Sequence, residues 1–145
     1  MISLVMDTSN SYLAVGLYQD NVCLEAFQEK GSRRQSEKAI PTLKEVLDRH
    51  HIALKDVNEM IITSGPGSYT GVRVAMTIAK TLAAVSDVRI KSVSSLAAYA
   101  GMNQALSVID ARGHKVFVGV YENALPLIKE QVVALEDFAQ LRAEY

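Results

Sequence analysis

The sequence has little cysteine and no long apolar run. Cys23 is the single cysteine among 145 residues, so no disulfide can form within the chain, and this usage is typical of a reducing compartment. The apolar runs are far shorter than the roughly 20 residues that a membrane-spanning helix needs. An apolar strand pattern starts at Ile2 with no basic segment before it, which argues against a secretory leader. We therefore expect a soluble cytoplasmic protein with no membrane contact.

An excess of either charge is also missing. The chain has 15 basic and 16 acidic residues, so no overall field draws it to nucleic acid or to a membrane surface. Hydrophobic residues make up 49% of the sequence, which suffices for the core of one ordinary domain or of two small ones. Direct binding of RNA over a broad basic surface is therefore not expected.

Motifs of several catalytic classes are absent. The three histidines include the adjacent pair His50 and His51, and no H-x-x-x-H or H-E-x-x-H pattern occurs, so a zinc site has no support. No serine stands in a motif that would supply a base. Catalytic residues can also meet from distant positions, so these absences exclude the motifs and not every activity.

Residues 61–75, IITSGPGSYTGVRVA, combine an apolar strand, a glycine-rich turn and a helix start. A Walker A loop needs lysine after its second glycine, and here Val72 follows Gly71. The dinucleotide fingerprint needs glycine where Thr70 stands. Amides at the helix start could still hold an anion, while Ser68 or Thr70 could cap the helix in a turn that binds nothing. Both interpretations stay open.

The pattern of apolar residues predicts an α/β fold. Three strands open the chain, and helices then alternate with strands up to Gly101, which is suited to ending a helix. This order is typical of a ribonuclease-H-like domain with a mixed sheet and packed helices. The expected elements are strands 2–6, 12–18, 22–28, 60–63 and 88–93, and helices 34–49, 70–85 and a short one after Ser94.

Two segments of the chain resemble each other at a constant offset. Residues 4–18, LVMDTSNSYLAVGLY, and residues 107–121, SVIDARGHKVFVGVY, share an Asp in the turn and a Val-Gly-x-Tyr ending. We interpret them as a duplication, which predicts a first unit over 1–104 and a second over 105–145. The second unit would contain a third strand over 128–133 and a helix with Leu135, Phe138 and Leu141 inward. It would therefore hold half the elements of the first.

Asp7 and Asp110, one in each turn, are candidate ligands of a metal-bound nucleotide. A two-metal nuclease also needs an acid after the fourth strand, where residues 63–65 supply none. Actin-like ATPases and sugar kinases place an Asp in each of two duplicated hairpins, beside a glycine that lets backbone amides wrap a phosphate. The turn after Asp7 has no glycine, and Arg112 follows Asp110 by two positions. The alternative is that each Asp caps its own turn.

Four segments together resemble the TsaB family, also called YeaZ. They are MDTSNSYLAVGLYQDN, GPGSYTGVRVAMTIAKTLA, VSSLAA and DARGHKVFVGVY, and they extend from Met1 to about Tyr121. The resemblance implies an actin-like ATPase (ASKHA) fold in an inactive relative of TsaD. It implies that the chain is not itself an enzyme but supports TsaD, together with TsaE, in forming N6-threonylcarbamoyladenosine on tRNA.

The resemblance also implies a partner surface on the first two helices, which pair with TsaD or with a second copy. The residues expected there are Ile40, Leu43, Leu47, Tyr69, Thr70, Arg73 and Thr77. Ala75, Ala79 and Ala83 would allow close approach, to a partner or equally to the sheet. A homodimer is expected for the isolated chain, and tRNA is met only through the complex. No cofactor is expected on the chain alone, whereas ATP or ADP and Mg²⁺ belong to the complex with TsaD.

Two alternatives from other classes remain. The first is an actin-like ATPase or small kinase with its own nucleotide site, which a nucleotide titration would detect. The second is a glycoprotease-type peptidase, after the label attached to TsaD relatives, which would need a metal cluster or a nucleophile–base pair.

Overall fold

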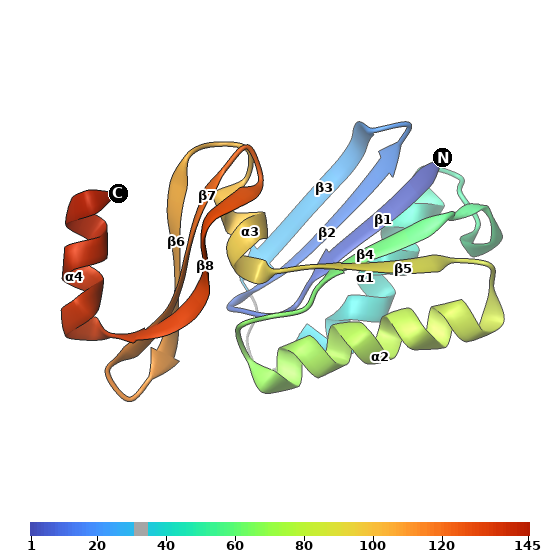
Figure 1. Ribbon diagram of the computed structural model, residues 1–145. Helices are drawn as coiled ribbons and strands as arrows, with labels where there is room; N and C mark the ends of the chain where they lie inside the picture. Colours follow the sequence, from blue (N-terminus) through green and yellow to red (C-terminus); the bar gives the residue numbers. More distant parts are fainter. Residues whose placement is uncertain (31–34) are drawn as a thin grey trace. The chain divides into compact units, whose positions relative to one another are not determined.

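The computed structural model describes residues 1–30 and 35–145, which form two compact units (Figure 1). Unit 1 comprises Met1–Ser64 and Ser68–Ser92, and unit 2 comprises Gly65–Gly67 and Val93–Tyr145. In the described part of the chain, no helix is both long enough and apolar enough to span a bilayer.

Unit 1 is built on a five-stranded mixed sheet. Its order is β3-β2-β1-β4-β5, with β1 antiparallel to β2 and parallel to β4. The strands are β1 (Ile2–Asp7), β2 (Tyr12–Gln19), β3 (Val22–Lys30), β4 (Glu59–Thr63) and β5 (Arg89–Val93). The helices are α1 (Gln35–Arg49), a 3₁₀ turn (Leu54–Asp56) and α2 (Tyr69–Val85). The predicted start of the first helix at Arg34 lies outside the described residues.

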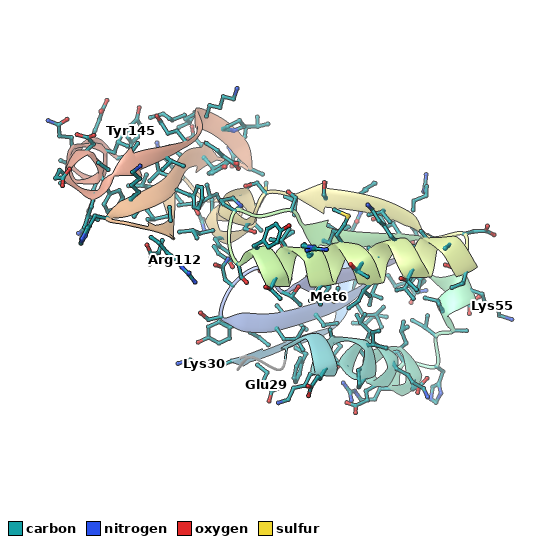
Figure 2. The ribbon with its side chains drawn as sticks, turned by 90° about the horizontal axis from the view of Figure 1, so that it is seen from below. Met6, Glu29, Lys30, Lys55, Arg112 and Tyr145 are labelled. Carbon is teal, nitrogen blue, oxygen red and sulfur yellow. The ribbon has the colours of Figure 1, made fainter. Side chains whose placement is uncertain are left out.

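One face of this sheet carries the core of unit 1. Strand residues alternate between faces, and the cross-strand pairs Leu4–Leu17 and Leu4–Met60 place the same apolar face on β1, β2 and β4. Both α1 and α2 pack on this face (Figure 2). Ala75 and Ala79 of α2 are fully buried in that core. These two alanines therefore pack against the sheet and not against a partner. The sequence had left both arrangements open.

The end of α1 is joined to β3 by an ion-pair cluster. The Arg49 guanidinium donates from Nη2 to Oε2 of Glu25 at 2.5 Å and from Nε to Oε1 at 3.1 Å. His50 Nε2 lies 2.9 Å from the same Oε1. Hydrogen bonds from Arg49 and then from His50 lower the pKa of Glu25 to about 2.

This cluster predicts a pH-dependent stability. Because the folded pKa of Glu25 is about 2, against an ordinary 4.5, the unfolded chain binds more protons between these values. The stabilisation is therefore complete above pH 4.5 and is lost as the pH falls toward 2. We expect the melting temperature of Glu25→Gln to fall less steeply than that of the wild type across this window. Parallel melting curves from pH 2 to pH 6 would contradict the prediction.

Unit 2 is a three-stranded antiparallel sheet in the order β6-β7-β8, with one helix on each side (Figure 1). Its core joins Leu96 and Ala100 of α3 to Ile109 of β6 and Tyr121 of β7. Gly101 ends α3 with φ +63°, as the sequence predicts. The elements are β6 (Ala105–Arg112), β7 (Lys115–Glu122), β8 (Leu125–Ala134), α3 (Ser95–Ala100) and α4 (Leu135–Glu144).

The predicted duplication is confirmed in the strands. β2 and β7 begin and end 103 residues apart, and β1 and β3 begin 103 residues before β6 and β8. In each unit a tyrosine ring lies over a glycine two residues earlier. A Cβ on Gly16 would lie 2.9 Å from Cε2 of Tyr18, and one on Gly119 would lie 2.7 Å from Cε2 of Tyr121. The predicted α/β class with a ribonuclease-H-like order is confirmed as well.

The boundary between the compact units differs from the boundary of the repeat. The repeat places it at 104/105, whereas the contacts divide at Ser92/Val93. The physical reason is that α3, which precedes the repeat, packs on β6 and β7. Gly65 goes with unit 2 because its carbonyl accepts the Ser95 N–H at 2.8 Å.

Candidate functional site

The glycine-rich turn launches α2 from the end of β4. Gly65 has φ +93°, a conformation that favours glycine. Ser68 is the N-cap of α2, and its Oγ accepts the Gly71 N–H at 3.2 Å. Of the two caps that the sequence offered, the structure uses Ser68.

The turn between β1 and β2 contacts this helix start. Thr8 Oγ1 donates to the Gly71 carbonyl at 2.6 Å, and the Ser68 N–H donates to the Ser9 carbonyl at 2.6 Å. A Cβ on Gly71 would lie only 1.9 Å from the Thr8 carbonyl oxygen. Gly71 is therefore needed for close backbone approach. The sequence analysis did not predict this contact. Its one signal in the sequence is that Gly71 is the third residue of a helix, a position where alanine would be favoured.

Both candidate aspartates cap their own turns. Asp7 Oδ1 accepts the Ser9 N–H at 2.8 Å, the Ser9 hydroxyl at 2.6 Å and the Thr63 hydroxyl at 2.6 Å. Asp110 Oδ1 accepts the Arg112 N–H at 2.8 Å. The acceptor and donor of these turn bonds stand at the same repeat offset. Each Asp side chain thus accepts a backbone N–H two residues later and caps its own turn, which was the second of the two interpretations given for the sequence.

The two aspartates lie on different faces of their hairpins. Asp7 is opposite Ala14, on the face that carries Gly16 and Tyr18. Asp110 is opposite Val116, and the residues at 117, 119 and 121 of the same strand lie on the other face of the sheet. Asp110 is therefore on the face away from Gly119 and Tyr121. A bulge between Asp110 and Arg112 shifts the second hairpin by one residue relative to the first. One residue of slip reverses the face of every side chain on a strand.

These observations do not fit a repeated pair of aspartates around a metal-bound nucleotide. One Asp7 oxygen is already occupied by three donors of the chain itself, and Asp110 does not occupy the equivalent face. Among residues 1–30 and 35–145, no group of three or more His, Cys, Asp or Glu side chains could hold a metal ion.

An apolar groove lies between α1 and α2. It has a volume of about 320 Å³, and its floor reaches Leu4 of the central strand. Cavities of this size, lined mostly by aliphatic side chains, are typical binding sites. Its lining residues come from β1, α1, α2 and the 52–54 segment: Leu4, Ile40, Leu43, Lys44, Leu47, Asp48, Ile52, Ala53, Leu54, Thr77, Ile78, Thr81 and Leu82.

The predicted partner residues occupy two neighbouring parts of unit 1. Ile40, Leu43, Leu47 and Thr77 line the groove, where Leu43 and Leu47 are buried and Ile40 is 60% exposed. Tyr69, Thr70 and Arg73 lie outside it on the first turns of α2. Tyr69 is 76% exposed, and the Arg73 guanidinium lies 5.4 Å from its ring centroid. We call these three residues the helix-start patch.

Comparisons with known proteins identify a family that the sequence resembles. The family model described as "TsaD: tRNA N6-adenosine threonylcarbamoyltransferase" matches residues 28–144. The tRNA threonylcarbamoyladenosine biosynthesis protein TsaB of Bacillus subtilis is 32% identical over 99% of the chain and 67% of its own length. Its Escherichia coli counterpart is 30% identical over 82% of the chain and 54% of its own length.

A solved structure gives the same result for the fold. YeaZ from Pseudomonas aeruginosa superposes with a TM-score of 0.83 at 28% identity, covering 91% of this chain and 67% of that one. The chain thus spans between about half and two thirds of the length of these relatives.

Proposed function

The chain belongs to the TsaB family, and on this premise we propose that it is a non-catalytic partner of TsaD in forming threonylcarbamoyladenosine on tRNA. The α1–α2 groove is the observation that carries the proposal, since it offers a protein partner an apolar cavity beside exposed side chains. The turn-capping role of Asp7 and Asp110 supports it, because a scaffold needs no ligand there. TsaE, tRNA and the nucleotide with Mg²⁺ would be met only in the complex with TsaD, in the cytoplasm.

The partner surface in this proposal consists of the groove and the helix-start patch. Exposed aromatic and arginine side chains beside an apolar pocket are the residues that most often dominate binding energy. Tyr69 and Arg73 are such a pair. In isolation, a second copy would cover the same surface, so the homodimer and the complex with TsaD would exclude each other.

The experiment measures the mass of the complex by light scattering after the chain is mixed with TsaD from the same organism. We expect a mixed complex, and we expect Tyr69→Ala to weaken it about tenfold or more. Tyr12→Ala is the matched control, because Tyr12 is also exposed (45%) but lies on β2. A folded chain that leaves TsaD unbound would contradict the proposal. An ATP titration of the isolated chain, expected to show no binding, separates it from the ATPase alternative.

A further inference from the structure

The β1–β2 turn and the start of α2 are joined by more contacts than chain connectivity requires. They lie 63 residues apart in sequence at Thr8 and Gly71, yet share two hydrogen bonds of 2.6 Å. The absence of a side chain on Gly71 lets the helix backbone approach the Thr8 carbonyl. We call this set, Thr8 and Ser9 with Ser68 and Gly71, the turn–helix contact.

The turn side of this contact is itself held firmly. Thr8 and Ser9 are both fully buried, and buried hydroxyls are costly unless they are hydrogen-bonded. Asp7 binds the Ser9 N–H and hydroxyl and also accepts the hydroxyl of Thr63 at the end of β4. The turn is thereby fixed to two strands of the sheet, and it can act as a support for the helix that rests on it.

The helix side of the contact is the first turn of α2, which also carries the helix-start patch. Gly71 lies between Thr70 and Arg73, and Tyr69 is the first residue of the helix. Further along, Ala75 and Ala79 fasten the helix to the core. Beyond the core, the turn–helix contact therefore determines how the exposed first turn is placed.

We propose that Thr8 is a positioning residue for the partner surface, acting through Gly71 on Tyr69, Thr70 and Arg73. The proposal rests on the proposed function for its partner. In this proposal the β1–β2 turn holds a docking helix in place. Because coupling is reciprocal, a partner bound at the helix-start patch stabilises the turn in return.

The first test uses the isolated full chain and amide hydrogen exchange. Thr8→Val keeps the shape of the side chain and removes the hydroxyl, and Thr8→Ser restores the hydroxyl. Ser3→Ala is the matched control, since Ser3 is 8% exposed and donates to Glu59 Oε1 at 2.8 Å away from α2. We expect exchange at residues 69–74 to be about tenfold faster in Thr8→Val, the change that one lost hydrogen bond allows. Thr8→Ser and Ser3→Ala should match the wild type there.

The second test compares the affinity of the same variants for TsaD. Thr8→Val should bind several-fold more weakly, while Ser3→Ala and Thr8→Ser bind as the wild type does. Unchanged exchange at 69–74, or an equal change in Ser3→Ala, overturns the proposal. Faster exchange with unchanged affinity also overturns it, because the turn then holds the helix without serving the surface. A wild-type chain that leaves TsaD unbound overturns the proposed function instead, and the exchange result alone then decides whether Thr8 positions the helix.

Discussion

Replacing Gly71 with alanine is expected to lower the free energy of unfolding by about 3 kcal/mol, at the upper end of the range for overpacking. Helix propensity alone predicts the opposite sign, since alanine is favoured over glycine by roughly 1 kcal/mol in a helix interior. The clash outweighs this preference because the added Cβ would lie 1.9 Å from the Thr8 carbonyl oxygen and 3.0 Å from its carbon. Both atoms belong to a buried backbone that cannot rotate away.

Urea denaturation of Gly71→Ala measures this loss, and Gly101→Ala serves as the comparison. Gly101 has φ +63° and ψ −142°, a backbone conformation that is almost restricted to glycine, and no atom lies within 4 Å of an added Cβ. Its replacement therefore costs backbone strain alone, about 1–3 kcal/mol, with no clash. A Gly71→Ala chain as stable as the wild type, or more stable, would show that helix propensity outweighs the contact. Faster exchange in Gly71→Ala should centre on the first turn of α2.

The strands of both units could be predicted because their signal is local. Alternating apolar residues such as Leu13, Val15 and Leu17 define a strand face without reference to the rest of the chain. The duplication was visible for the same reason, since an Asp in the turn and Val-Gly-x-Tyr recur in register. In both units the tyrosine ring lies over the glycine two residues earlier, at Gly16 and at Gly119, and this packing gives a physical reason for the repeated ending.

The different placement of the two aspartates could not be predicted from the repeat. The register of a hairpin changes at a bulge, and the second hairpin has one between Asp110 and Arg112, whereas β1 and β2 pair without one. The first hairpin closes at Asp7–Ala14, whereas the second continues to Arg112–Lys115 around two residues, Gly113 and His114, that both have positive φ. A sequence alignment at constant offset contains no information about the one-residue shift at this bulge.

The site was predictable only in part, because apolar helix positions serve a core and an interface alike. Leu43 and Leu47 were predicted at a partner surface, and both are buried side chains that line the α1–α2 groove. Ala75 and Ala79 follow the same spacing and face the sheet. The importance of Gly71 depends on a contact with Thr8, which no pattern around residue 71 reveals.

Removing the ring of Tyr121 is expected to lower the free energy of unfolding by about 3–4 kcal/mol, as for other buried aromatic residues replaced by alanine. Tyr121 is 3% exposed, belongs to the core with α3 and covers Gly119. Its hydroxyl donates to Glu130 Oε1 at 2.7 Å. Burial, and then this hydrogen bond, raise the pKa of Tyr121 to about 12, so the hydroxyl keeps its proton at neutral pH.

Three variants separate the contributions of Tyr121. Tyr121→Phe keeps the ring over Gly119 and should lose about 1.5–3 kcal/mol, the value of a hydrogen bond to a charged acceptor. Tyr99→Ala, at a 49% exposed position on α3, should stay within about 0.5 kcal/mol of the wild type. If Tyr121→Phe lowered the free energy of unfolding as much as Tyr121→Ala, the hydroxyl would contribute more than the packing of the ring over Gly119. Tyr18→Ala should lower the free energy of unfolding less than Tyr121→Ala does, because Tyr18 is only half-buried. The tyrosine that packs over the glycine would then stabilise unit 2 more than unit 1.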